Sequence, residues 1–286
     1  MKASALSDHK FAAFQVMPEA DAFLTPLSDV DRARHYPYAA PDGGYVLAHG
    51  ALYRLDQTQI DRHPWLFEGR VPVLSVGSNR APFQLHRKFG GAAIVPVTPA
   101  RLFDCDIVHA AMLGYYAAVP CTAFPARGCE VRLNVAWLDE KQLVQMHRTE
   151  AVGVAYDYIR FHAGAVTHLP VPLAGGDVVS GYQPIFGYAA RTGVLDSGDG
   201  QPAALSRIQA NRRVFKTMSQ HDAAMLVRRL TGHDDDRDMP RFIQDMQADR
   251  AARNVIIEKL SSHMLFADDA PWQVIDMTLD DLDAFI

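Results

Sequence analysis

Five short stretches between residues 71 and 161 limit the choice of fold more than any other feature of the sequence. Each is rich in β-branched, aromatic or other apolar residues and is bounded by glycine, proline or polar turn residues, a pattern typical of β-strands. We therefore predict a strand-rich central region. The predicted strands are residues 71–76, 92–97, 106–112, 129–138 and 155–161.

The stretch EVRLNVAWL (130–138) also indicates how its strand is oriented. Its large apolar residues alternate with smaller or polar ones, which places the two sets on opposite faces of a strand. The pattern predicts a half-buried antiparallel strand. The inward set is Val131, Leu133, Val135 and Trp137, and the outward set is Glu130, Arg132, Asn134 and Ala136.

Two helices are expected to interrupt these strands. The first begins near Ser78 or Pro82 and continues through PFQLHRKF, because proline is well suited to the first helical turn. The second begins at Asp139, whose side chain can cap the helix, and Gln142 three residues later completes a capping-box pattern.

The segments on either side of this region have a different character. GGYVLAHGALYRL (43–55) predicts a hairpin between glycine-containing turns. After about residue 201, helix-forming residues predominate, and helices are predicted over 202–215, 219–232 and 239–266. We therefore expect three parts, with the last packed on the same domain as the second. They are an N-terminal arm (1–70), a central domain (71–215) and a helical C-terminal extension (216–286).

Composition excludes several classes of protein. Hydrophobic residues make up 49% of the 286 residues and charged residues 21%, which is sufficient for a sizeable core. The net charge of −5 argues against nucleic-acid binding. No apolar stretch reaches the ~18 residues of a membrane span, and the N-terminus lacks the apolar stretch of a signal peptide. A cytoplasmic protein is expected, and a homodimer is compatible with the sequence.

Neither the cysteines nor the acidic residues form a pattern of metal or disulfide sites. Cys105, Cys121 and Cys129 have no CxxC spacing and are interpreted as core thiols. The acidic run HDDDRD (233–238) lacks partners at the spacing of metal ligands and is interpreted as a solvated loop. The basic NRR (211–213) is interpreted as a solvated helix face.

Glu150 is the first candidate for a working side chain. It follows Leu143 by seven residues and Met146 by four, which places all three on one face of the predicted helix. A carboxyl on an apolar face is costly to bury unless it is paired or protonated, and such a group is suited to proton transfer. His147 lies three residues earlier and could orient or protonate Glu150, although a helix histidine one turn away is usually just partly exposed.

A second candidate is the turn in VLSVGSNRAP (73–82). A strand enters a Gly-Ser-Asn turn and leaves into a helix, so the N–H groups of Gly77, Ser78 and Asn79 are expected to point outward near a helix N-terminus. Such donors bind anions. An ordinary capped turn explains the same residues, and the glycine spacing fits neither a P-loop nor a dinucleotide-binding motif.

Taken in order, these motifs resemble the γ-glutamylcyclotransferase-like family. VGSNRAP (76–82) matches the family's substrate turn, and AVPCTAFPARGCEV (118–131) matches its Ala-Thr strand. LVQMHRTEAVGVAYDYIRF (143–161) matches a helix ending in Glu followed by a Tyr strand. FGYAARTGVLDSGDGQPAALSRIQANRR (186–213) is similar in outline to a later Tyr strand and helix.

The resemblance covers about residues 71–215 and implies an α+β fold. In this fold a small antiparallel β-barrel of cyclotransferase type carries flanking helices, here with a helical C-terminal extension. It implies that Glu150 is the catalytic acid and base for a γ-glutamyl amide. The substrate's α-amine would attack its own γ-carbonyl, releasing 5-oxoproline and an amine, with no metal or other cofactor.

The resemblance also implies which residues bind this small substrate, which carries a carboxylate. The turn would grip the glutamyl end, and tyrosines are candidates for the pocket walls. Cys121 has no histidine at a recognisable spacing to activate it as a nucleophile. The implied substrate-binding residues are Val76, Gly77, Ser78, Asn79, Arg80, Tyr115, Tyr116 and Tyr156.

The chain departs from the family's pattern in its substrate turn. Val76 stands where the family has an aromatic residue, Arg80 where leucine is usual, and Glu150 precedes Ala151 instead of glycine. Arg80 can offer a guanidinium to a second carboxylate or a phosphate, or it can be a surface residue. Two alternatives therefore stay open: a hydrolase or lyase of another small amide that uses Glu150, and a non-catalytic ligand-binding protein.

Overall fold

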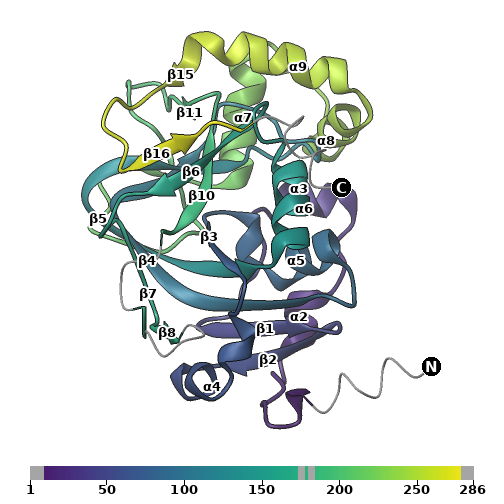
Figure 1. Ribbon diagram of the computed structural model, residues 1–286. Helices are drawn as coiled ribbons and strands as arrows, with labels where there is room; N and C mark the ends of the chain where they lie inside the picture. Colours follow the sequence, from purple (N-terminus) through teal and green to yellow (C-terminus); the bar gives the residue numbers. More distant parts are fainter. Residues whose placement is uncertain (1–9, 173–177, 180–183, 278–286) are drawn as a thin grey trace.

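The computed structural model describes residues 10–172, 178–179 and 184–277. One large, mostly antiparallel sheet forms the centre of the described chain, and helices pack around it (Figure 1). The expected mixture of α and β structure is confirmed. The strands of the sheet are β1 (Gly44–Ala48), β2 (Ala51–Leu55), β3 (Val71–Ser75), β4 (Ile94–His109), β5 (Cys121–Leu138), β6 (Tyr156–Phe161), β7 (Val166–His168), β10 (Phe186–Ala190), β12 (Ala204–Leu205), β13 (Ala210–Asn211), β14 (Thr217–Met218) and β16 (Trp272–Ile275).

The sheet follows an open path in the order β14-β12-β4-β5-β3-β10-β6-β16. Most neighbours are antiparallel, while β10 runs parallel to β3 and β14 parallel to β12. No pairing among the described residues joins β14 to β16, so a closed barrel is not confirmed. Two small sheets pair β8 (Val171–Pro172) with β9 (Val178–Val179), and β11 (Val194–Leu195) with β15 (Met264–Leu265).

The predicted strands 92–97 and 106–112 largely belong to one strand, β4, which forms a long hairpin with β5. Their register runs from Val97 opposite Ala136 to His109 opposite Cys121, with an irregularity between Phe103 and Cys105. The sequence predicted two strands here because prolines and charged residues within β4 interrupt its apolar pattern. Proline in particular is usually excluded from central strands. The other predicted strands and the hairpin of β1 and β2 are confirmed.

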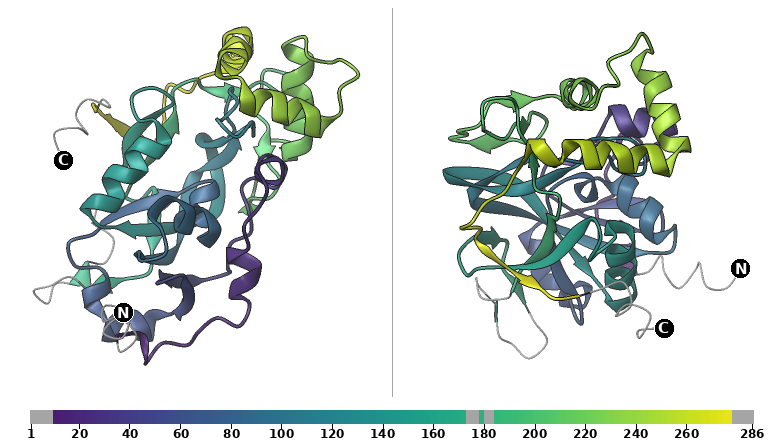
Figure 2. Two further views of the ribbon diagram at one scale, coloured as in Figure 1. Left: turned by 90° about the vertical axis from the view of Figure 1, so that its right-hand side faces the viewer. Right: turned by 90° about the horizontal axis from the view of Figure 1, so that it is seen from above.

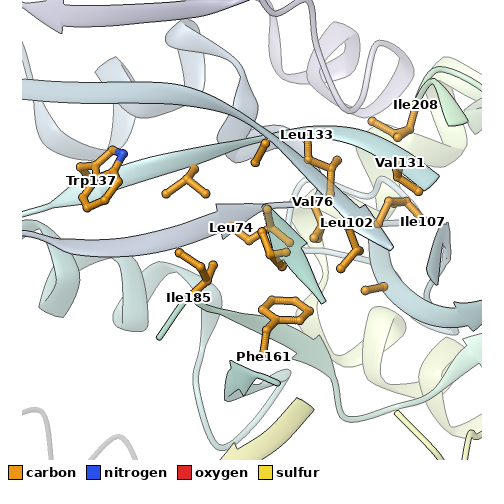
Figure 3. Packing of buried hydrophobic residues seen from close by; sticks show 14 of the residues in the cluster. Leu74, Val76, Leu102, Ile107, Val131, Leu133, Trp137, Phe161, Ile185 and Ile208 are labelled. Carbon is orange, nitrogen blue, oxygen red and sulfur yellow. The ribbon is translucent and has the colours of Figure 1, made fainter. Parts of the chain in front are cut away.

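Strand β5 is half-buried only in its first part. Val131 and Leu133 are buried while Arg132 is exposed, as the alternation predicts. From Asn134 to Leu138 every residue is buried, so the prediction of a half-exposed strand is wrong for this part. The sheet has a core on each face here. Val131, Leu133 and Trp137 belong to one core, shown in Figure 3, whereas Ala136 and Leu138 belong to the other.

Helices α5 and α6 contribute to this second core through Leu85 and Met146. Asp139 caps α6 as predicted: its side chain accepts from Gln142 N at 2.9 Å, and Gln142 Oε1 accepts from Asp139 N at 3.2 Å. The 3-10 turn η2 and then α5, with Pro82 in its first turn, follow β3, as expected. The helices are α2 (Ala20–Leu24), α3 (Asp29–Arg34), α4 (Gln57–Arg62), η1 (Pro64–Leu66), η2 (Ser78–Arg80), α5 (Pro82–Phe89), α6 (Glu140–Glu150), α7 (Gln220–Leu230), α8 (Met239–Ala248), α9 (Arg250–Lys259) and η3 (Leu260–His263).

The C-terminal helices α7, α8 and α9 gather at one end of the molecule, opposite the β1–β2 hairpin (Figures 1 and 2). They form a separate apolar cluster with α3 and with residues between β4 and β5. The division of the chain into three parts stays a prediction. Among the described residues, no helix has both the length and the apolar character needed to cross a membrane.

Two helix predictions near the C-terminus are wrong. The segment 202–215 forms the short strands β12 and β13, which pair with β4 and β5. Its alanine, leucine and arginine residues favour helix, but the open edges of the long hairpin provide partners that override this propensity. The predicted helix over 239–266 is interrupted at Asp249, whose side chain caps α9 by accepting from Ala252 N at 3.0 Å.

Candidate functional site

Glu150 is the last residue of α6, and its carboxylate forms an ion pair inside the molecule. The helix ends because Ala151 adopts a left-handed conformation with φ of 49°. Lys88 Nζ donates to Glu150 Oε1. The Glu150 side chain is 16% exposed and that of Lys88 is 2% exposed. The carboxylate predicted to lie on a buried face is therefore paired, as its burial requires.

Lys88 was not recognised in the sequence as a functional residue. It comes from α5, and its Nζ also approaches Met146 Sδ at 3.2 Å. Burial lowers the pKa of Lys88, while the charge of Glu150 acts in the opposite direction. A signal was present, because Lys88 follows the buried Leu85 by three residues and therefore lies on the apolar face of α5.

Asn79 is the second partner of Glu150. Its Nδ2 donates to Glu150 Oε1 at 3.0 Å, so both donors use the same carboxylate oxygen. Among the described residues, no donor reaches Glu150 Oε2. The Oδ1 atom of Asn79 is buried and lacks a hydrogen-bond donor within the described part of the chain. A buried acceptor without a partner, as at Asn79 Oδ1, is unusual inside a protein, whereas Glu150 Oε2 belongs to a side chain that is still 16% exposed.

The turn at Gly77 brings the backbone close to other parts of the fold. A Cβ atom at position 77 would lie 2.3 Å from Tyr36 Oη and 2.9 Å from Cys121 Sγ, so a larger residue does not fit. The N–H groups of Gly77, Ser78 and Asn79 donate to no acceptor in the described chain, as expected at the start of a short helical turn. These residues line the smaller cavity together with Glu150.

Two cavities meet at Glu150. One has a volume of about 30 Å³, which is room for one or two water-sized groups. The other has a volume of about 250 Å³, close to the ~300 Å³ of the smallest ligand pockets. Both are lined by Tyr36, Ser78, Glu150 and Tyr156.

The predicted binding residues divide between these cavities. The smaller cavity is lined by Val76, Gly77, Asn79 and the shared residues. The larger cavity is lined by Tyr115 and Tyr116, together with residues of α9. The structure therefore brings seven of the eight predicted substrate-binding residues to the two cavities at Glu150.

In comparisons with known proteins, no family model, curated protein or solved structure matches this chain. The resemblance seen in the sequence is therefore neither supported nor refuted by relatives. What the site can do chemically depends on its own residues.

The larger cavity carries positive charge on its wall. Arg87, Arg250 and Arg253 line it together with Lys88, and Glu150 is the one carboxylate among the lining residues that the structure describes. Arg253 Nη1 donates to the carbonyl oxygen of Met246, which fixes it at the end of α8. Such an excess of cations favours a ligand with negative charge. Sequence reasoning missed the arginines of α9 because they lie at least 100 residues from Glu150 in the chain.

Arg80 is the predicted site residue that does not reach these cavities. Its Nε donates to Asn134 Oδ1 at 3.1 Å, and it lines a separate cavity on another part of the surface. Burial lowers the pKa of Arg80. A role for Arg80 in holding the substrate at Glu150 stays a prediction that the geometry does not favour.

His147 and Cys121 lie near Glu150 without contacting it. His147 is 2% exposed, and its Nδ1 shares a hydrogen bond of 2.9 Å with Tyr188 Oη. Burial lowers the pKa of His147 to about 4, against the influence of Glu150. Burial raises the pKa of Cys121 to about 12, so the thiol stays protonated near neutral pH. All three cysteines are buried and unpaired, as predicted.

The acidic run 233–238 forms the loop between α7 and α8, and Asp234, Asp235 and Asp236 are exposed, as predicted. Asp235 accepts from Arg228 and Arg237, and Asp238 caps α8. Across the part of the chain that the structure describes, no cluster of three or more histidine, cysteine or acidic side chains could hold a metal ion.

Proposed function

We propose that this protein is a γ-glutamylcyclotransferase-like enzyme that cleaves a γ-glutamyl amide, or a similar amide, with Glu150 as its acid and base. One observation carries the proposal: Glu150 Oε2 and Asn79 Oδ1 have no donor among the described residues, and both residues line the smaller cavity. A substrate amine supplies the N–H groups that both acceptors need. We also propose that the central sheet corresponds to the small barrel of the cyclotransferase type.

In this proposal the substrate's α-amine occupies the smaller cavity, whose volume of about 30 Å³ suits a group of that size. Its α-carboxylate accepts from the N–H groups of Gly77, Ser78 and Asn79, as anions do at such turns. The γ-amide then extends into the larger cavity. These contacts hold the amine near the γ-carbonyl carbon, so the gain comes chiefly from positioning.

The reaction needs one proton transfer through Glu150. The α-nitrogen forms a bond to the γ-carbonyl carbon, and Glu150 takes a proton from that nitrogen. Glu150 then gives this proton to the leaving nitrogen as the amide bond breaks, which releases 5-oxoproline and the free amine. Lys88 compensates the charge of the carboxylate and keeps Oε1 occupied, so Oε2 is the oxygen available for the proton.

Two alternative functions use the same residues. A hydrolase or lyase of another small amide would also need Glu150, but it would not need a free α-amine. A non-catalytic ligand-binding protein is favoured by the ion pair itself, because Lys88 and Asn79 already satisfy one oxygen of Glu150 without a ligand. A binding protein does not need an acid at this position.

Mass spectrometry can test the proposal. Wild-type protein and the Glu150→Gln variant are incubated with γ-glutamyl dipeptides, glutathione and γ-glutamyl amines, and 5-oxoproline is measured. We expect product from the wild type and a decrease of at least about 100-fold in the variant, the usual contribution of a general acid or base. Glu140→Gln is the matched control, because Glu140 is exposed in the first turn of the same helix.

A blocked substrate separates the alternatives. N-acetylation of the α-amine should abolish turnover by cyclisation, whereas a hydrolase would still release the amine. If neither folded protein forms product and ligand binding survives in Glu150→Gln, the cyclotransferase proposal is wrong and the binding role is supported.

A further inference from the structure

A third cavity, of about 850 Å³, shares no lining residue with the two cavities at Glu150. It lies against β4, β5 and β7, and four arginines line it: Arg80, Arg101, Arg132 and Arg207. Among the described residues that line it, Asp42 is the one carboxylate. In a chain with a net charge of −5, this local excess of positive charge requires a separate explanation.

The sheet register concentrates two of these charges. Arg101 and Arg132 are directly opposite each other in the antiparallel pair of β4 and β5, and their side chains therefore lie on the same face of the sheet. Like charges in this arrangement destabilise a sheet. Glu130 accepts from Arg101 at 2.7 Å, but no carboxylate of the described chain pairs with the exposed Arg132.

The other two arginines approach from outside the strands. Arg80 is held by Asn134, on β5, through its Nε at 3.1 Å, and Arg207 Nη1 donates to the carbonyl oxygen of His35 at 3.3 Å. Neither guanidinium forms an ion pair with a carboxylate of the described residues. Each is fixed by one polar contact, and most of its N–H donors are left for a ligand.

We propose that this cavity binds a small, multiply charged oxyanion that carries phosphate or carboxylate groups. Guanidinium groups match both kinds of oxyanion in geometry and charge. Binding would also relieve the repulsion between Arg101 and Arg132. The volume suits a small molecule, and the negative charge of the whole protein argues against a nucleic acid. The proposal is independent of the function of Glu150.

Isothermal titration calorimetry at low ionic strength tests the site with two probes, tripolyphosphate and citrate. We expect saturable binding of at least one probe by the wild-type protein, and a stronger response to one identifies phosphate or carboxylate as the preferred group. Arg132→Ala and Arg207→Ala should each weaken binding about tenfold or more, as for charge-assisted hydrogen bonds. Both arginines are exposed, so folding should be retained.

Two controls make the result decisive. Arg127→Ala removes an exposed arginine of β5 that does not line the cavity and should leave binding unchanged. Glu150→Gln should also leave it unchanged, which would separate this site from the proposed active site. The proposal is wrong if neither probe binds saturably, or if Arg127→Ala weakens binding as much as Arg132→Ala.

Discussion

Two carboxylate–cation pairs within the described chain are mostly buried, and the partners of their carboxylates differ. Asp106 is 0% exposed and accepts from Arg213 at 2.8 and 3.0 Å. Its Oδ1 also accepts from Ile107 N at 2.7 Å, so both of its oxygens have donors. Glu150 places both of its donors on one oxygen and leaves the other beside a cavity.

The difference separates a structural ion pair from one that is available for chemistry. Asp106 and Arg213 fasten the segment after β13 to β4, and Asp106 lines none of the cavities described above. Burial raises the pKa of Asp106, and Arg213 offsets this only in part. The interpretation of residues 211–213 as a solvated helix face is wrong in its helix and for Arg213, which is mostly buried, whereas Asn211 and Arg212 are exposed as expected.

The largest effect on stability should come from breaking the fully satisfied pair. Asp106→Ala is expected to lower the free energy of unfolding by about 3–5 kcal/mol, because it leaves Arg213 buried without a counter-charge. Urea denaturation measures the change. Asp157→Ala is a control, since Asp157 and Arg191 form a more exposed pair whose loss should cost at most about 1 kcal/mol. Equal losses would show that burial does not distinguish the two pairs.

A smaller loss is expected when the pair at the cavity is broken. Lys88→Met retains the length of the side chain and its contact with Met146 while removing the charge. We expect a loss of about 2 kcal/mol in the free energy of unfolding, the range for hydrogen bonds to charged groups, because the cavity lets water reach the released carboxylate. Urea denaturation beside Asp106→Ala compares the pairs directly. A loss as large as that of Asp106→Ala would contradict an accessible Glu150.

Two buried histidines, His109 on β4 and His147 on α6, add a pH dependence to stability. Burial lowers the pKa of both His109 and His147 to about 4, whereas in the unfolded chain a histidine titrates near ~6.5. The unfolded state therefore binds more protons between these values, so stability is fully present above about pH 6.5 and falls as the pH is lowered toward 4.

Each histidine should contribute about 1–2 kcal/mol of the stability lost between pH 7 and pH 5. His109→Gln and His147→Gln should each reduce this loss, as measured by chemical denaturation at both pH values. The quantity compared between wild type and variant is the change in the free energy of unfolding from pH 7 to pH 5, and not its value at pH 7. An unchanged pH dependence in both variants would show that these imidazoles are not kept neutral by burial.

Much of the candidate site was visible in the sequence because its signals are local. The capping box at Asp139 and Gln142 fixed the start of α6, and the spacing of Leu143, Met146 and Glu150 identified the face that carries the carboxylate. The Gly-Ser-Asn turn was recognised in the same way. These patterns involve residues within a few positions of each other, where helix and turn geometry act directly.

The partners of the charged groups could not be predicted in this way. Lys88 is 62 residues from Glu150, and Arg213 is 107 residues from Asp106. Helix propensity likewise gave the wrong prediction for 202–215. Short segments of this region form strands because they pair with the open edges of β4 and β5.

The sequence by itself determined the mixed α and β class, the hairpin of β1 and β2, the helix that carries Glu150 and the turn that faces it. Only the tertiary structure decided that Lys88 and Asn79 occupy one oxygen of Glu150, that Arg80 faces a different cavity, and that Arg213 neutralises Asp106. The physical reason is the distance along the chain over which each interaction acts. Local geometry depends on neighbouring residues, whereas the pairing of buried charges depends on which distant segments the closed core brings together.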